Sequence, residues 1–281
     1  MNIEEERKVL NDVCQELINE KWISKIIEHY VYQIIEQKNE NNTLIYQTKF
    51  GEKHGEFKKI TNDNKLIGKG YYRHEKEEGE FTYWYTNGNN KVTVIYKNGK
   101  EEGELKQWFE NGQLEMICHY KNGLEEGEHK QWYNNGQLQL LSYYKNGLED
   151  GESKQWFENR VGDAVRSQTD LTNEMREPRD PVSQSPEGDN GQLQFQIQFK
   201  EGKMNGSYKQ WHNNNQMYIE SHYINGKKTG EGKQWFQNGQ LQGLLFYLDD
   251  KLHGEFKQWN EEGILLHHQI YEDGELIENI I

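Results

Sequence analysis

A tryptophan recurs every 24 residues along most of this chain, a spacing that restricts the fold to one built from copies of a single unit. A glycine keeps the same period, five residues before each tryptophan. The tryptophans are Trp84, Trp108, Trp132, Trp156, Trp211, Trp235 and Trp259, and the glycines are Gly55, Gly79, Gly103, Gly127, Gly151, Gly206, Gly230 and Gly254. The sequence predicts eight copies of the unit, the first with Ile60 at the tryptophan position.

Each unit contains two strand signals and two turn signals. The first strand is predicted over about 104–109 and ends at Asn111-Gly112, a dipeptide suited to a type I′ turn because both central residues need a positive φ. Over 193–199, apolar residues alternate with glutamines, which indicates a half-buried antiparallel strand. A second turn, at Asn122-Gly123, leads into the next unit. Each unit is therefore predicted to be one β-hairpin, and the array a mainly β, single-layer antiparallel meander.

The regular tryptophans favour a structural role. Neighbouring strands lie about 4.8 Å apart, so successive rings are expected at roughly twice that spacing, as a packed ladder along the sheet. The alternative is that the exposed rings are ligand platforms, as in cell-wall-binding repeats that stack sugars or choline. The packed ladder is favoured here because the other features of the sequence indicate an intracellular protein.

Composition supports an elongated sheet and excludes several partners. Apolar residues make up 33% of the chain and aromatic residues 12%, which suits a thin core of large rings. The net charge of −14 argues against nucleic acid and against anionic membrane surfaces. Cys14 and Cys118 lack metal-site spacing and are expected to be reduced thiols. With an acidic N-terminus and no apolar run of about 18 residues, the expected location is intracellular.

Two segments depart from the array. Removing 160–190 joins Asn159 to Gly191 and restores the usual Asn-Gly-Gln-Leu text, so this 31-residue segment is predicted to be an insertion at a hairpin tip, disordered because it is poor in apolar residues. It contains all three prolines and four of the six arginines, which suggests a foreign element; a partner-binding loop is the alternative. Apolar residues of the N-terminal segment, up to Ile34, recur at helical spacing, which predicts a helical cap over 1–40, with a docking motif as the alternative.

No catalytic, cofactor-binding or metal-binding residues are predicted. His119 and His222 share a repeat position but lack neighbours with metal-ligand spacing, and adjacent His267 and His268 are expected on opposite faces of a strand. The glycines follow turn spacing and form no phosphate-binding loop.

Charged residues also repeat. Acidic pairs precede the repeat glycine, and they are expected to be a solvated edge, with a cation-attracting carboxylate row as the alternative. The pairs are Glu77-Glu78, Glu101-Glu102, Glu125-Glu126 and Glu149-Asp150. Glu104 and Lys106 share a face with the tryptophan, where cross-strand pairing is expected to set the register.

The unit that runs from Tyr144 through Asn146-Gly147 to Trp156 resembles the MORN repeat family, in the variant with two Asn-Gly turns found in bacterial antitoxin-like and giant-virus arrays. The resemblance covers about 44–281 and implies a twisted antiparallel sheet over 41–281 that serves as a scaffold. The function expected is non-catalytic, intracellular protein–protein interaction with an unidentified partner. If the source is viral, the location expected is the host cytoplasm. The alternatives are an antitoxin-like neutraliser of a partner enzyme, and lipid or carbohydrate binding through the aromatic ladder.

Overall fold

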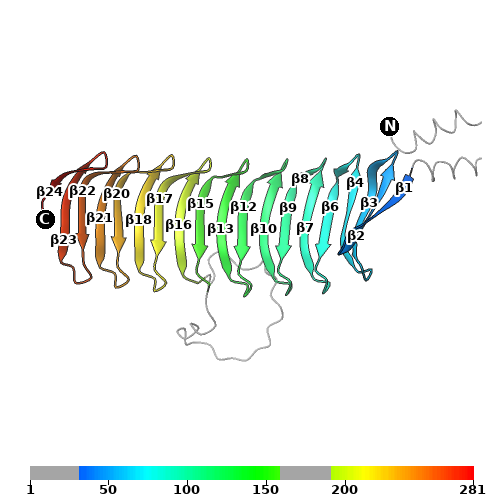
Figure 1. The fold of residues 1–281 in the computed structure, drawn as a ribbon, viewed down its shortest axis with the longest axis horizontal. Helices are drawn as coiled ribbons and strands as arrows, with labels where there is room; N and C mark the ends of the chain where they lie inside the picture. The colour runs from blue at the N-terminus through cyan, green and yellow to red at the C-terminus, as the bar shows by residue number, and fades with distance from the viewer. Residues whose placement is uncertain (1–31, 159–190) are drawn as a thin grey trace, which may run out of the picture. The chain divides into compact units, whose positions relative to one another are not determined.

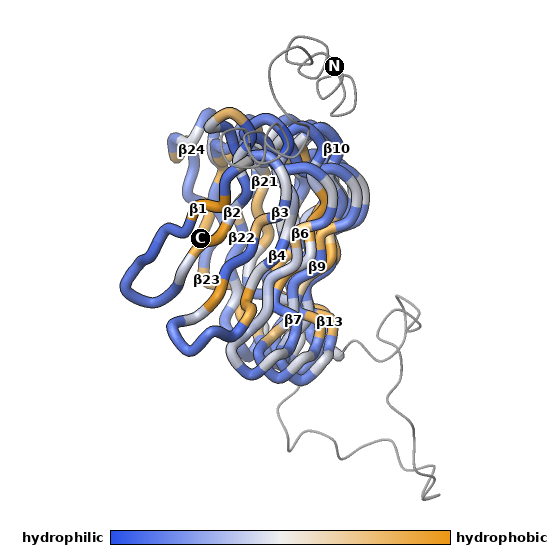
Figure 2. Tube along the Cα trace, turned by 90° about the vertical axis from the view of Figure 1, so that its right-hand side faces the viewer, coloured by the Kyte–Doolittle hydropathy of each residue, from blue (hydrophilic) through white to orange (hydrophobic). Residues whose placement is uncertain are grey.

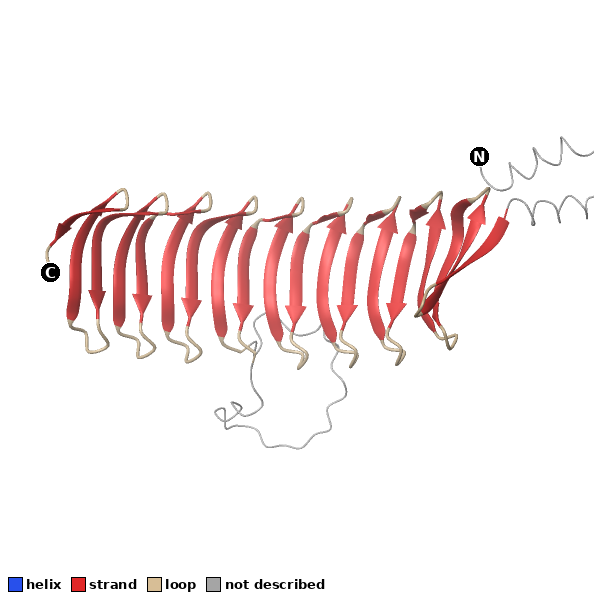
Figure 3. Ribbon diagram, in the orientation of Figure 1, coloured by secondary structure: helices blue, strands red, loops and turns tan. Residues whose placement is uncertain are grey.

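The computed structural model describes residues 32–158 and 191–281, and these residues contain strands and turns but no helix (Figure 3). They belong to two compact units. The first contains the chain up to Gly103 together with Glu110–Gly112, and the second contains Glu104–Phe109 and the chain from Gln113 onward. Within each unit, strands that follow one another in the chain pair antiparallel, as the repeat predicts (Figure 1).

The first unit is built from eight strands. They are β1 (Tyr32–Lys38), β2 (Asn42–Lys49), β3 (Glu52–Thr61), β4 (Leu66–Arg73), β5 (Lys76–Glu77), β6 (Gly79–Trp84), β7 (Asn90–Lys97) and β8 (Lys100–Glu101).

The second unit continues the same alternation of a longer strand, a short strand after a tight turn, and a strand that ends at the repeat tryptophan. Its strands are β9 (Gly103–Trp108), β10 (Leu114–Lys121), β11 (Leu124–Glu125), β12 (Gly127–Trp132), β13 (Leu138–Lys145), β14 (Leu148–Glu149), β15 (Gly151–Trp156), β16 (Leu193–Lys200), β17 (Lys203–Trp211), β18 (Met217–Ile224), β19 (Lys227–Lys228), β20 (Gly230–Trp235), β21 (Leu241–Leu248), β22 (Lys251–Trp259), β23 (Leu265–Glu272) and β24 (Glu275–Asn279).

One hairpin shows the strand register that recurs in each copy of the repeat. His129 of β12 lies opposite Ser142 of β13, and Lys130 lies opposite Leu141. Residues directly opposite each other share a face of the sheet. We call the side of His129 and Ser142 the buried face, and the side of Lys130 and Leu141 the lysine face.

A β-bulge ends each hairpin next to the tryptophan. The register shifts between Gln131 and Trp132, so that Trp132 pairs with Leu138. Leu138 and Leu141 pack with Trp156, although strict alternation along the strand would place these two leucines on opposite faces. The bulge thus moves the first leucine of the second strand to the side of Leu141, which simple alternation did not predict.

The two Asn-Gly turns of a repeat copy have different geometries. The prediction of a type I′ turn at Asn111-Gly112 is wrong. There only Gly112 has a positive φ, of 88°. At the second turn both Asn122 and Gly123 have positive φ, of 54° and 79°, as type I′ requires. The first turn follows the bulge and is longer, so its asparagine has another role. The side-chain oxygen of Asn135, for example, accepts a hydrogen bond from the backbone N–H of Gln137 at 2.9 Å.

The helical cap predicted over 1–40 needs a correction at its C-terminal end. Tyr32–Lys38 forms strand β1, which pairs antiparallel with β2 and places Ile35 opposite Tyr46. Helical spacing of isoleucines was misleading here, because β2 offers a line of backbone groups that a strand can satisfy. The remainder of the predicted cap, up to residue 31, lies outside the described residues.

The best-buried side chains lie on the buried face. Apolar residues fall within the strands and hydrophilic residues at the turns (Figure 2). In the second unit Cys118 is fully buried and Ser142 is 1% exposed. In the first unit Phe81 is 1% exposed and stacks on Phe57 with ring centroids 5.9 Å apart. The buried face thus carries a row of side chains along the strand centres, with rings in the first unit and small polar groups in part of the second, while Leu138, Leu141 and Trp156 form a further buried cluster on the lysine face.

The second member of each of three acidic pairs binds the backbone of the following copy. The Glu126 carboxylate accepts a hydrogen bond from the N–H of Asn146 at 2.8 Å, and Glu78 accepts one from Asn98 at 2.9 Å. Asp150 accepts one from the N–H of Glu201 at 3.2 Å. These carboxylates therefore hold adjacent turns together, in addition to being solvated.

The lysines of the first strands pair within their own strand. Lys130 lies 2.6 Å from Glu128, and Lys106 lies 2.6 Å from Glu104. The expected cross-strand pairing occurs at Lys209 and Glu220, which are opposite in the register and 3.3 Å apart.

Strands β15 and β16 flank the segment 159–190, which is not described. Trp156 pairs with Leu193, and the N–H of Phe157 donates to the carbonyl of Gln192 at 2.9 Å. The corresponding bond of an uninterrupted copy, from Tyr133 to Gln137, is 2.8 Å long. The hairpin therefore closes in the same way on both sides of the extra segment.

Candidate functional site

The repeat tryptophans are not equally buried. Trp156 is 8% exposed and packs against Leu138 and Leu141, with Trp132 and Leu193 partly buried beside this cluster. The remaining five, Trp84, Trp108, Trp211, Trp235 and Trp259, are half-buried. In the first unit the Lys69 ammonium lies 5.7 Å from the centroid of the Trp84 ring. That the repeat tryptophans form one continuous structural ladder stays a prediction.

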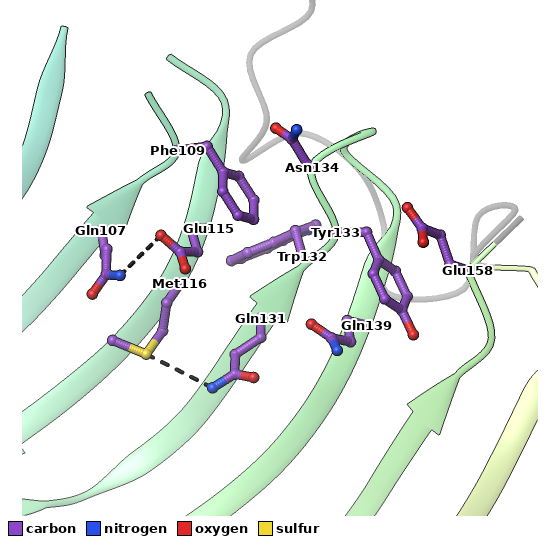
Figure 4. A pocket seen from close by; sticks show the side chains of 10 residues that line it. All are labelled: Gln107, Phe109, Glu115, Met116, Gln131, Trp132, Tyr133, Asn134, Gln139 and Glu158. Carbon is purple, nitrogen blue, oxygen red and sulfur yellow. Dashed lines mark hydrogen bonds between the residues drawn. The ribbon is translucent and has the colours of Figure 1, made fainter. Parts of the chain in front are cut away.

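A pocket of about 420 Å³ opens at the strand ends of the second unit, between β9 and the residues that follow β15 (Figure 4). Its lining combines amide side chains, aromatic rings and two carboxylates. The lining residues are Gln107, Phe109, Glu115, Met116, Gln131, Trp132, Tyr133, Asn134, Gln139 and Glu158. They come from three successive copies, so the register of the array builds the pocket.

Local sequence fixes the aromatic wall of this pocket. Tyr133 follows the bulge at Trp132, and its hydroxyl donates to the backbone carbonyl of Trp156 in the next copy at 2.8 Å. Burial raises the pKa of the Tyr133 hydroxyl, and the nearby Glu158 carboxylate raises it further. The hydroxyl is therefore a neutral donor at physiological pH, and its bond holds the ring in place between two copies.

The amide groups of the pocket are partly engaged and partly directed toward its interior. Gln107 donates to the Glu115 carboxylate at 2.9 Å, and the Gln131 amide nitrogen lies 3.9 Å from the sulfur of Met116 (Figure 4). A carboxamide offers both a donor and an acceptor, which is what an incoming peptide backbone requires. With the rings of Phe109 and Tyr133 beside them, these groups suit an extended peptide that carries an apolar side chain.

A second cluster, made of metal-ligand side chains, lies farther along the same strands. Cys118, Glu125 and His129 bring a sulfur, a carboxylate oxygen and an imidazole nitrogen within 4.8 Å of one another. Residue spacing did not reveal this cluster, because its members lie on three strands. The turn at Asn122-Gly123 folds β11 against β10, and reading the repeat register across strands is the signal that brings them together.

None of the described residues belongs to a helix with the length and hydropathy needed to cross a membrane.

Comparison with known families matches the array. A family model described as a MORN repeat variant matches five times, over residues 77–98, 101–122, 125–146, 204–225 and 228–249. Each match begins at the second residue of the strand that follows a tight turn, and it ends at the first residue of the next tight turn. Comparison with curated proteins gave no match.

Proposed function

Because the chain is a MORN repeat-containing protein, we propose that it is a non-catalytic scaffold that binds another intracellular protein in the pocket lined by Trp132 and Tyr133. MORN repeats are associated with scaffolds that bind proteins or membrane lipids. The choice between these two ligands rests on this chain's own residues.

The pocket chemistry is the observation that carries the proposal. Three glutamine amides and three aromatic rings line a space of about 420 Å³, large enough for a few residues of a peptide. Aromatic residues are the commonest anchors of protein interfaces, because they bury a large area with few rotatable bonds. Glu115 and Glu158 add negative charge, which favours a peptide with a basic residue near the apolar one.

Charge supports a protein partner over an anionic lipid. The net charge of −14 repels acidic headgroups, and two of the groups that line the pocket are themselves carboxylates. Cys118 is a free, buried cysteine, which supports a reducing intracellular location.

Site-specific photo-crosslinking tests the proposal. A photoreactive amino acid is placed at Gln139, in the pocket, or at Gln242, the same repeat position outside it. Both residues are half-buried, so the two variants are matched. We expect a discrete cross-linked protein from position 139 in cells that make the chain naturally, and none from position 242. Equal labelling at both positions would contradict the pocket, and cosedimentation with anionic vesicles without a protein cross-link would favour the lipid alternative.

A further inference from the structure

Three side chains of metal-ligand type meet on the buried face of the second unit. Cys118 lies in β10, Glu125 in β11 and His129 in β12, and their ligand atoms are mutually within 4.8 Å. Cys118 is fully buried, His129 is 8% exposed and Glu125 is half-buried. A buried thiol beside an imidazole and a carboxylate is unusual, because the other buried side chains in the described part of the second unit are apolar or hydroxylic.

The pairing register of three strands brings these three side chains together. Met116 lies opposite Gln131 and Ile117 opposite Lys130, so Cys118 and His129 are the next residues along two paired strands. The tight turn after β10 then places Glu125 opposite Tyr120. The three ligands are therefore held by backbone pairing and not by a mobile loop, which keeps their geometry fixed.

The imidazole is oriented from both sides. Its Nδ1 contacts the Glu125 carboxylate, and its Nε2 lies 3.0 Å from the amide of Gln131. A histidine that binds a metal through one ring nitrogen usually hydrogen-bonds through the other, which fixes the ring. With the metal on Nδ1, the Nε2–H donates to Gln131 once the amide is turned so that its oxygen faces the ring, a simple exchange of the nitrogen and oxygen positions of the group.

Negative charge accumulates around the cluster. Glu149, from the following copy, is half-buried and interacts electrostatically with both Glu125 and His129. The Glu149 and Glu125 carboxylates repel each other electrostatically. A cation bound beside Glu125 would offset this repulsion.

We propose that Cys118, Glu125 and His129 form a binding site for a thiophilic divalent transition metal of the Zn²⁺ class. Thiolate, imidazole and carboxylate are ligands that Zn²⁺ and Co²⁺ share, and three protein ligands leave a fourth tetrahedral position for water or Glu149. Cys118 binds as the thiolate, so its proton passes to solvent when the metal is bound.

The neighbouring copy provides a natural comparison. At the positions of Cys118 and His129 it carries Ser142 and Ser153, whose hydroxyl oxygens are 2.7 Å apart. The double change Cys118→Ser and His129→Ser therefore imports a pair that this sheet already accommodates. It removes two ligands with the least disturbance to packing.

Cobalt spectroscopy tests the proposal directly. The full chain, freed of metal under reducing conditions and carrying Cys14→Ser, is titrated with Co²⁺. We expect a thiolate-to-cobalt charge-transfer band that saturates at one ion per chain and is displaced by Zn²⁺. The band should be absent from the Cys118→Ser and His129→Ser double variant. It should be unchanged in His119→Ala, which removes an exposed histidine next to Cys118.

Further variants distinguish a metal site from a structural ion pair. Gln131→Leu should weaken Co²⁺ binding about 10–100-fold while keeping the band, as for other groups that orient a metal ligand. Circular dichroism of each variant checks that the sheet is intact. No band in the Cys14→Ser protein, or a band that persists in the folded double-serine variant, would overturn the proposal.

Discussion

The hydroxyl oxygens of Ser142 and Ser153 lie 2.7 Å apart in the core of the second unit, where both side chains are buried. The serines occupy adjacent strands β13 and β15, so the bond links two copies of the repeat. The array thus uses a polar contact at a position where the first unit uses aromatic rings such as Phe81.

Replacing one of these serines should lower the free energy of unfolding by more than half of the loss caused by replacing both. Ser142→Ala leaves the Ser153 hydroxyl buried without its partner, which costs about 1–3 kcal/mol, whereas the double alanine variant leaves no orphaned group. Denaturant unfolding of the two single variants and the double variant gives the coupling free energy. Additive effects would show that the two hydroxyls do not depend on each other.

Substituting glycine for the two turn asparagines of a repeat copy should change the free energy of unfolding by different amounts. At Asn146, φ is 52°, so Asn146→Gly removes a mildly strained side chain and should be close to neutral. Asn135→Gly loses the side-chain bond to Gln137 and should reduce the free energy of unfolding by about 0.5–1.5 kcal/mol. Equal losses at the two sites, measured by urea unfolding, would be inconsistent with the turn geometries described above.

Alkaline pH should destabilise the first unit through its tyrosines. Burial raises the pKa of the Tyr72, Tyr83 and Tyr96 hydroxyls above the ordinary value of 10.0, and the Glu77 carboxylate raises it further. Above about pH 10 the unfolded chain therefore binds fewer protons at these groups than the folded chain, and the free energy of unfolding falls as the pH rises.

Tyrosinate absorbance and urea unfolding at about pH 9 and about pH 11 check this sign. Tyr96→Phe should reduce the alkaline loss, whereas Tyr71→Phe, at an exposed position, serves as the control. A free energy of unfolding that is constant or rises over this range would contradict the prediction.

Deleting 160–190 should leave the array intact. The bond from Phe157 to Gln192 already closes this hairpin as in uninterrupted copies, so joining Asn159 to Gly191 recreates an ordinary turn. Circular dichroism and the melting temperature should be essentially unchanged. Loss of the β-sheet signal would mean that the segment is needed for folding.

The repeat predicted the strands because two turn signals and one tryptophan per copy leave little freedom in the chain path. Prediction from the sequence was wrong where pairing between strands overrides the spacing of apolar residues along the chain. The bulge at Trp132 moves Leu138 to the side of Leu141, and pairing with β2 converts the isoleucine-rich residues after Val31 into a strand.

The candidate sites were harder to predict than the fold. The pocket depends on which side chains of three copies converge, and single differences such as Tyr133 or Met116 decide its lining. The Cys118 cluster was missed because its ligands become neighbours across strands, whereas metal-ligand motifs are read along the chain.

The affinity of the cross-linked partner, or of its pocket-binding peptide, for two matched variants shows whether the pocket holds that partner. Tyr133 lines the pocket, and Phe236 occupies the same repeat position outside it, with similar half-burial. If the pocket holds the partner, Tyr133→Ala should raise the Kd about 30-fold, which corresponds to losing an anchor residue that contributes about 2 kcal/mol of binding free energy. Phe236→Ala should leave the Kd unchanged. Equal Kd values for the wild type and both variants would contradict a scaffold that binds its partner in this pocket.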